Sequence, residues 1–187
     1  GQVEDDASII TGASDIRRNM DLLQAARRAH PDTCLIYKPH PDVEAGLRDG
    51  QIDAESLADL VVTRTDPASL LTQVDEVWTM TSLLGFEALL RGVKVTTLGA
   101  PFYAGWGLTT DLDTVPVRRG ARPSLMGLVH ATLIDYPRYF DPITRQPCPV
   151  EVAVERLALG YSAPSGPFNR FLSKLQGAFA THAHLWR

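Results

Sequence analysis

The chain has 187 residues, of which 44% are hydrophobic and 21% are charged, and its formal net charge is −4 at neutral pH. This composition is typical of a globular protein with enough chain for one full core. The negative charge argues against a general nucleic-acid binder. Two isolated cysteines predict neither a zinc site nor a disulfide scaffold. No apolar run is long enough to span a bilayer and no segment has signal-peptide character, so we expect a cytoplasmic location.

The first part of the chain predicts a helix and a strand. Residues 1–8 are loop-like and resemble the end of a strand-to-helix turn whose strand has been removed. Ser14 is then expected to cap a helix over 15–29, because apolar residues recur there at helical spacing. A short buried strand follows over 33–37.

A proline-rich motif, Lys38-Pro39-His40-Pro41, comes directly after this strand. The two prolines prevent a helix from continuing and stiffen the backbone. Lys38 and His40 are therefore expected at the carboxyl end of a strand, which is the edge where open α/β sheets bind ligands.

Helices and strands then alternate as far as residue 98. Asp66 and Pro67 are expected to start one of the helices, as cap and first residue. The expected segments are helices over 43–47, 54–59 and 66–73, strands over 60–63, 74–78 and 93–98, and a helix that ends at Gly92. This order predicts an α/β fold: a Rossmann-like, doubly wound parallel sheet with helices on both faces.

The stretch 79–92 is the strongest candidate for a ligand site. Thr81 or Ser82 can cap the helix that follows the central strand, and the free N–H groups and positive dipole of such a helix suit a phosphate. Glu87 lies near the same helix end, where its carboxylate can accept two ribose hydroxyls. The alternative is an ordinary capped strand-to-helix turn that binds nothing.

A glycine- and aromatic-rich loop, 99–109, follows the last of these strands. Phe102, Tyr103 and Trp106 can stack on a base or a sugar, and Gly105 allows close backbone approach. The alternative is a packed surface loop anchored by its tryptophan. The basic strip 118–122 is expected to be solvated.

The last part of the chain predicts helices. Ser124 is expected to cap a helix to about Ile134, and a further helix covers 150–159. The segment 158–187 is a basic amphipathic tail, which either packs against a partner domain or lies on an anionic membrane surface. We therefore expect a sugar-nucleotide-binding domain over 1–157, with its first strand absent, and a helical tail over 158–187.

Four stretches together carry a family resemblance, and it covers about residues 1–157. Residues 1–8 (GQVEDDAS), 38–43 (KPHPDV), 82–92 and 101–109 (PFYAGWGLT) resemble the capsule polysaccharide biosynthesis proteins of Gram-negative bacteria. Those proteins are β-Kdo transferases that build the lipid-linked Kdo linker of capsules. The resemblance implies the C-terminal, donor-binding domain of a GT-B glycosyltransferase that uses CMP-Kdo without a metal or other cofactor.

Residue roles follow from the chemistry and the resemblance together. Lys38, His40, Thr81 and Ser82 are expected to surround the CMP phosphate, and His40 to protonate it as it leaves. The family is described as retaining, which implies a carboxylate nucleophile. Asp6 matches that family position best and Asp5 second, although Asp6 in a plain helix-capping turn is the alternative. The remaining expected donor-binding residues are Gln2, Ser8, Gly85, Glu87, Phe102, Tyr103, Gly105 and Trp106.

Some contacts and functions stay open at this stage. The Kdo carboxylate could be held by Lys38, by the basic strip or by Asn169. The acceptor, phospholipid-linked Kdo, would bind an absent N-terminal domain, so this chain alone is expected to be inactive. The tail could give peripheral contact with the inner membrane. The alternatives are another CMP- or UDP-sugar enzyme, sialyltransferase-like or epimerase-like, or a degenerate domain that only docks a partner.

Overall fold

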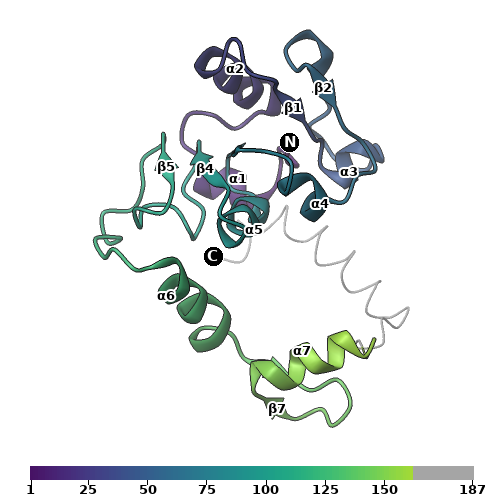
Figure 1. The fold of residues 1–187 in the computed structure, drawn as a ribbon, viewed down its shortest axis with the longest axis vertical. Coiled ribbons are helices and arrows are strands. Elements are labelled where there is room, and N and C mark those ends of the chain that lie inside the picture. Colours follow the sequence, from purple (N-terminus) through teal and green to yellow (C-terminus); the bar gives the residue numbers. More distant parts are fainter. Residues whose placement is uncertain (162–187) are drawn as a thin grey trace, which may run out of the picture. The chain divides into compact units, whose positions relative to one another are not determined.

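The computed structural model describes residues 1–161, which fall in two compact units (Figure 1). The first unit is Gly1–Val129 and the second begins at His130. Each unit is described by itself below. The expected boundary after residue 157 stays a prediction, and the expected amphipathic face at 168–179 lies outside the described residues.

The first unit alternates short helices and strands in the expected order. Its helices are α1 (Ala7–Gly12), α2 (Asn19–Ala29), α3 (Pro41–Glu44), the 3-10 turn η1 (Ala54–Ser56), α4 (Pro67–Leu71), α5 (Leu83–Leu90) and most of α6 (Leu125–His130). Its strands are β1 (Ile36–Tyr37), β2 (Leu60–Val61), β3 (Glu76–Thr79), β4 (Lys94–Thr97) and β5 (Thr110–Asp111).

All five strands of this unit pair in parallel, in two hydrogen-bonded groups. β1 pairs with β2, with Ile36 opposite Leu60. β3, β4 and β5 form a second group in that order, with Val77 opposite Val95. The prediction of an α/β fold with parallel strands is confirmed. The strands were expected to form one sheet, but in the structure they form two separate hydrogen-bonded groups.

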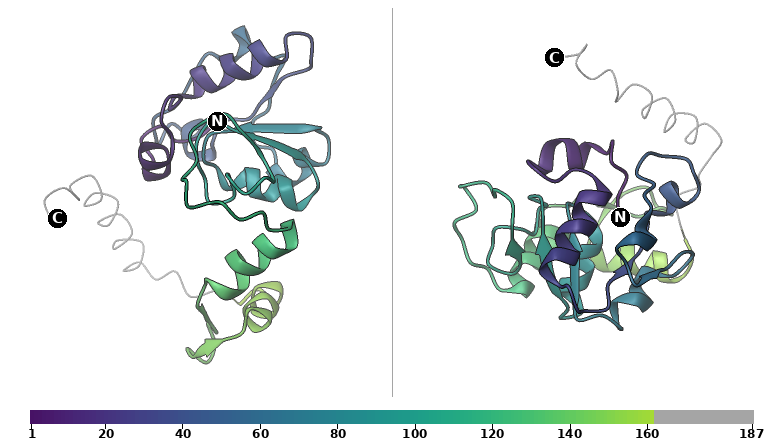
Figure 2. Two further views of the ribbon diagram at one scale, coloured as in Figure 1. Left: turned by 90° about the vertical axis from the view of Figure 1, so that its left-hand side faces the viewer. Right: turned by 90° about the horizontal axis from the view of Figure 1, so that it is seen from above.

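Successive residues of β3 face opposite sides of the sheet, and each side is covered by helices. Val77 packs in the cluster built around Phe86 of α5. Trp78, the next residue, packs with Ile9 of α1 and Leu22 of α2. Figure 2 shows α2 and α5 on opposite sides of the β3 and β4 arrows. Because strand side chains alternate in direction, both faces of this sheet are buried, as expected for a doubly wound arrangement.

Three predicted helix boundaries in the middle of the unit are confirmed. Asp66 caps α4 through a bond from the Ser69 amide, with Pro67 at the first helical position. Ser82 caps α5, and Gly92 follows its end with φ +74°, a conformation that glycine adopts without a steric penalty.

Two local predictions are wrong and two short elements were missed. The helix expected over 43–47 is α3, which begins at Pro41 after the His40 cap and ends at Glu44. Ser14 does not cap a helix: its amide donates to Asp113 at 2.8 Å, and α2 begins at Asn19 after an uncapped Arg18. α1 was not predicted, because its six residues are too few to show a helical period. β5 was also missed, since its two residues are recognisable only by pairing with β4.

The second unit is small. It follows α6, which begins in the first unit after Ser124, whose hydroxyl accepts from the Gly127 amide, as predicted. From Ala131 to Asp135, where the α-helix was expected to continue, the second unit forms a π-helical turn. A hairpin of β6 (Tyr139–Phe140) and β7 (Pro147–Cys148) and the helix α7 (Val150–Ala158) follow. Across residues 1–161, no helix has the length and apolar character needed to cross a membrane.

Candidate functional site

The first residues of the chain join the carboxyl ends of β1 and β3. The amino group of Gly1 donates to the Lys38 carbonyl at 2.7 Å, just past β1. The Gln2 side chain binds residues at the end of β3. Residues 38–40 and residues 81–82 were both predicted to contact the CMP phosphate. The first residues of the chain, which were predicted to hold the nucleophile, therefore bring these two segments to one edge.

Gln2 is a buried connector at this edge. Its Oε1 accepts from the Thr79 hydroxyl and from the amides of Met80 and Thr81, at 2.9–3.1 Å. Its Nε2 donates to the Thr81 hydroxyl at 3.0 Å. Gln2 was predicted to bind the donor; in the structure its side chain orders the backbone that leads into α5.

Asn19 supports Gln2 and was missed by the sequence analysis. It is fully buried, and its side chain accepts from the Gln2 amide and donates to the carbonyls of Gln2 and Gly50, at 2.7–2.8 Å. Its own amide donates to Glu4. The only sequence signal for this supporting role is that Asn19 is a polar residue on the apolar face of a predicted helix. That signal does not show which residues Asn19 binds.

Asp6 is linked to the tip of α5 through Ser8. Asp6 caps α1 by accepting from the Ser8 amide at 2.8 Å, and the Ser8 hydroxyl lies 3.1 Å from the Thr81 hydroxyl. The capping turn considered as an alternative is thus present. Hydrogen bonds from the Ser8 side chain and backbone lower the pKa of Asp6, and the charge of Arg48 lowers it further. Asp6 is therefore ionised at neutral pH, as a nucleophile must be.

Asp5 is oriented differently from Asp6. Its carboxylate forms a 2.8 Å ion pair with Arg48, and both side chains are largely exposed. Asp6, by contrast, is the acid connected by hydrogen bonds to Thr81. Asp6 is therefore joined through Ser8 to the segment before α5, whereas Asp5 is joined to Arg48.

His40 caps α3 through one ring nitrogen. Its Nδ1 accepts from the Asp42 amide at 3.1 Å. With Nδ1 accepting, we assign the neutral ring its proton on Nε2, which makes Nε2 a hydrogen-bond donor.

Ser82 follows β3 along the chain, and Lys38 directly follows β1. The Ser82 hydroxyl accepts from the Leu84 amide at 3.2 Å and so caps the eight-residue α5. Leu84 and Lys38 line one cavity together with Gly1. The helix tip and the lysine therefore lie on the same edge of the fold, where the positive end of the helix dipole and the ammonium both favour an anion.

A cavity of about 370 Å³ lies beside Lys38, and it adds two candidate residues. Glu44 and Arg64 line it, and the Arg64 amide donates to the Glu44 carboxylate at 3.0 Å. Arg64 has φ +50°, an uncommon conformation for a residue with a side chain. Neither residue belongs to a recognisable motif, so their proximity to Lys38 emerges only in the folded chain.

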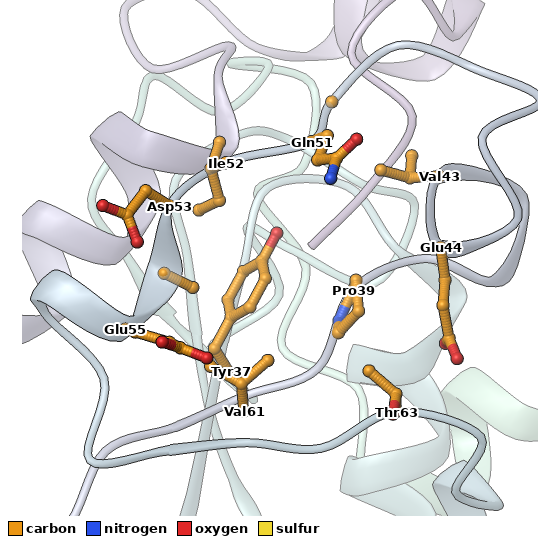
Figure 3. A pocket seen from close by; sticks show the side chains of 12 residues that line it. Tyr37, Pro39, Val43, Glu44, Gln51, Ile52, Asp53, Glu55, Val61 and Thr63 are labelled. Atoms are coloured by element: carbon orange, nitrogen blue, oxygen red, sulfur yellow. The ribbon is translucent and has the colours of Figure 1, made fainter.

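A second cavity, of about 320 Å³, lies by β1 and β2 (Figure 3). Figure 3 shows Tyr37 among its lining residues together with three carboxylates, from Glu44, Asp53 and Glu55. Because these carboxylates repel negative charge, this cavity is a poor place for a phosphate. The candidate phosphate site is therefore the edge where Lys38 and the first turn of α5 line one cavity.

Two predicted binding residues are packing residues in the structure. Tyr103 is fully buried in the α5 core cluster and donates to the Ser82 carbonyl. The Tyr103 ring packs against α5 at Gly85. A Cβ at Gly85 would lie only 2.7 Å from Tyr103 Cζ, so glycine is what leaves room for the ring. Tyr103 therefore acts by fixing the tip of α5, and we do not place it in contact with a ligand.

The rest of the aromatic loop is held by arginines. Arg119 donates to the carbonyls of Pro101 and Ala104 and stacks over Trp106 at 5.8 Å, and burial lowers its pKa. Arg122 donates to the carbonyl of Gly105, which has φ +82°. The expectation that the basic strip is merely solvated is wrong for these two arginines, which bind the loop.

Two other predicted binding residues remain partly accessible. Phe102 is 40% exposed and packs edge-on against Phe86. Glu87 is half-buried in the second turn of α5. Among residues 1–161, no group of three or more His, Cys, Asp or Glu side chains is placed to hold a metal ion.

Comparison with known proteins adds a family and two sequence relatives. The family model described as capsule polysaccharide biosynthesis protein matches residues 1–139. Capsule polysaccharide modification protein LipA of Neisseria meningitidis is 52% identical over 160 residues, which are 84% of this chain and 23% of the relative. Lipopolysaccharide-processing protein LpsZ of Rhizobium meliloti is 45% identical over 162 residues, which are 85% of this chain and 37% of the relative.

Two solved structures from Thermosulfurimonas dismutans are similar. KpsC, beta Kdo 2,7 transferase, aligns with a TM-score of 0.74 and 39% identity, and the match covers 84% of this chain and 52% of that one. KpsC, beta Kdo 2,4 transferase, aligns with a TM-score of 0.75 and 32% identity, covering 83% and 49%. The chain thus spans between about a quarter and a half of the length of these relatives.

Proposed function

The chain belongs to the capsule polysaccharide biosynthesis protein family, and from this membership we propose that it is the donor-binding domain of a retaining β-Kdo transferase. The donor is CMP-Kdo and the acceptor is the lipid-linked Kdo of a capsule linker. One observation carries the proposal: the bonds from Asp6 through Ser8 to Thr81 bring an ionised carboxylate to the tip of α5.

The phosphate of CMP lies at this tip in the proposal. The N-terminal amides of α5 and the Ser82 hydroxyl supply neutral donors, and Lys38 supplies a positive charge. His40 donates a hydrogen bond from Nε2 to a phosphate oxygen as CMP leaves. Because Nδ1 accepts from the Asp42 amide, the ring has one proton and no second proton to give, so the predicted proton transfer from His40 is not part of the proposal. Such a leaving group carries a single phosphate, so a few fixed donors are enough to stabilise it.

The nucleoside has two candidate carboxylates for its ribose hydroxyls. Glu87 lies in the second turn of α5. Glu44 lines the cavity beside Lys38 and is held by the Arg64 amide. That cavity, at about 370 Å³, falls within the range of small-molecule sites, which supports Glu44.

The transfer takes place in two displacements. The Asp6 carboxylate attacks the anomeric carbon of Kdo, the bond to the CMP phosphate breaks, and a covalent Kdo–Asp6 intermediate forms. An acceptor hydroxyl then attacks the same carbon, loses its proton and releases Asp6. Two inversions give net retention of configuration.

Several parts of the reaction lie beyond the described residues. The acceptor is proposed to bind a second, N-terminal domain in a GT-B arrangement. The Kdo carboxylate is proposed to contact Lys38, because Arg119 and Arg122 are engaged with the aromatic loop. Asn169 lies outside the described residues. Location at the cytoplasmic face of the inner membrane stays a prediction.

A thermal-shift panel of CMP, UDP, GDP and NAD tests the donor class. CMP is expected to raise the melting temperature of the chain and the other three to leave it unchanged, because a ligand that binds only the folded state stabilises it. Stabilisation by UDP alone would favour a different sugar-nucleotide enzyme. No shift with any of the four would favour a domain that only docks a partner.

Replacing the proposed nucleophile gives a direct test of mechanism. In a longer polypeptide that includes the acceptor domain, Asp6→Asn is expected to lower the rate of transfer by roughly 10³-fold or more, because the amide cannot form the covalent intermediate. Mass spectrometry after incubation with CMP-Kdo is expected to find Kdo on the peptide that carries Asp6.

Asp5→Asn is the matched control for this test. It removes a neighbouring carboxylate of the same size and breaks only the exposed ion pair with Arg48, so activity should stay within a few-fold of wild type. Kdo attached to Asp5, or full activity of Asp6→Asn, would refute the assignment.

A further inference from the structure

Arg64 lines the cavity of about 370 Å³ beside Lys38 and has no part in the reaction described so far. The cavity is lined by residues from two segments, the one after β1, which includes α3, and the loop after β2: Lys38, Pro41, Glu44, Ala45, Arg64 and Thr65. Because β1 and β2 pair in parallel, this cavity lies at the carboxyl ends of both strands, which is the ligand-binding edge of an open α/β sheet.

The backbone of Arg64 has an uncommon conformation. Its φ is +50°, in the left-handed region that residues with a Cβ enter only at a cost in free energy. The Glu44 carboxylate, in α3, accepts from the Arg64 amide at 3.0 Å and so holds the loop in this conformation. Residues with such backbones cluster at ligand-binding sites. An arginine at a position that suits glycine indicates a use for its side chain.

The guanidinium of Arg64 is available to a ligand. Other arginines of the first unit are engaged with the protein: Arg27 donates to the Leu57 carbonyl and Arg119 to the Pro101 carbonyl. Within residues 1–161, by contrast, the exposed side chain of Arg64 forms no hydrogen bond or ion pair. It therefore brings a positive charge and unused N–H donors to the wall of the cavity.

Lys38 connects this cavity to the candidate phosphate site. Its side chain lines the cavity of Arg64, and it also lines the cavity that Leu84 reaches from the first turn of α5. A nucleotide with its phosphate at that turn would extend its nucleoside past Lys38. Glu44 is then placed for the ribose, and Arg64, on the loop after β2, is left for the base.

The chemistry of the guanidinium favours one pyrimidine over the other. On its pairing edge, cytosine presents two neighbouring hydrogen-bond acceptors, O2 and N3, whereas uracil presents the acceptor O2 and an N3–H donor. A guanidinium has two parallel N–H donors in a fixed geometry. It can therefore form two hydrogen bonds with cytosine, but with uracil it forms one and meets a second donor.

We propose that Arg64 selects cytosine, by donating two hydrogen bonds from its guanidinium to O2 and N3 of the base. This inference rests on the proposed function, because it takes the donor to be a cytidylate. It adds a specificity-determining residue that contacts neither the phosphate nor the transferred sugar. The loop after β2, held by Glu44, then serves as the base-reading part of the site.

Calorimetric titration with CMP and UMP tests this assignment, since these nucleotides differ only in the base. The wild type is expected to bind CMP at least about tenfold more tightly than UMP, as a bidentate contact to a base allows. In Arg64→Ala the two Kd values should come within about twofold of each other, through weaker CMP binding. Arg64→Lys keeps the charge but loses the paired donors, so it should also lose most of the preference.

Arg64→Gly separates base recognition from a structural role. Glycine adopts a φ of +50° without steric cost, and the backbone amide that donates to Glu44 is kept. The midpoint of thermal unfolding should therefore not fall, while the preference for CMP is lost as in Arg64→Ala. An arginine with a structural role alone would give the opposite result, a lower midpoint with the preference intact.

Arg28→Ala is the matched control, because it removes the same charge from an exposed arginine in the last turn of α2. It should leave both Kd values unchanged. Equal losses of CMP and UMP affinity in Arg64→Ala would indicate a phosphate contact and overturn the assignment, as would an unchanged preference for CMP. Either result leaves the proposed function in place while the wild type binds CMP. Failure of the wild type to bind CMP would refute the proposed donor and this inference together.

Discussion

Replacing His40 and Ser82 together by alanine is expected to abolish CMP binding. Each side chain donates to the phosphate in the proposed complex, and a hydrogen bond to a charged group contributes about 1.5–3 kcal/mol. Losing both should raise the Kd by about 100-fold or more. Isothermal titration calorimetry of CMP with the wild type and the double variant measures this change.

Ser124→Ala with His130→Ala is the matched control. Ser124 caps α6 in the way that Ser82 caps α5, and His130 is an exposed histidine paired with Asp135. The control therefore loses one helix cap, worth about 1 kcal/mol, and one imidazole outside the candidate site. Its CMP affinity should be unchanged. Similar CMP affinity of the His40/Ser82 variant and the wild type would remove these residues from the phosphate site.

Gly85→Ala should destabilise the chain by about 2–3 kcal/mol. The new Cβ would meet the hydroxyl and Cζ of Tyr103, an aromatic-loop residue whose side chain is fully buried. Urea denaturation followed by circular dichroism measures the loss. CMP affinity should also fall, because Tyr103 donates to the Ser82 carbonyl at the tip of α5.

Gly127→Ala is the corresponding control within α6. A Cβ at Gly127 would make only ordinary contacts, 3.4 Å from the Ser124 hydroxyl and 3.6 Å from Pro123. Alanine is a better helix former than glycine by up to about 1 kcal/mol, so this variant should be as stable as the wild type or slightly more so. Equal stability of Gly85→Ala and Gly127→Ala would show that Tyr103 can shift without cost.

The candidate site owes its shape to a connector that sequence patterns do not reveal. Asn19 binds Gln2, and Gln2 orders the backbone of Met80 and Thr81. The donors at the tip of α5 are thereby fixed before a ligand arrives, which is the condition for strong electrostatic stabilisation of a leaving group. A substitution of Asn19 or Gln2 that keeps the charge of the site but removes these hydrogen bonds would not keep the backbone donors in place.

Local sequence features were sufficient for the elements whose signals are local. The Asp66-Pro67 start of α4, the Ser82 cap and the Gly92 end of α5 were all predicted, because a cap or a left-handed turn depends on a few neighbouring residues. The alternation of helices and strands was enough for the α/β class. The position of Lys38 and His40 after a strand was also predictable.

Long-range contacts settled what those local signals left open. Asp5 and Asp6 are adjacent and chemically identical, yet one pairs with Arg48 and the other connects through Ser8 to the tip of α5. Tyr103 has an aromatic side chain of the kind that stacks on ligands, but its ring is buried against Gly85. Burial and pairing depend on which residues far apart in the sequence come into contact. Those contacts form only in the packed chain, so the residues next to a position in the sequence do not reveal them.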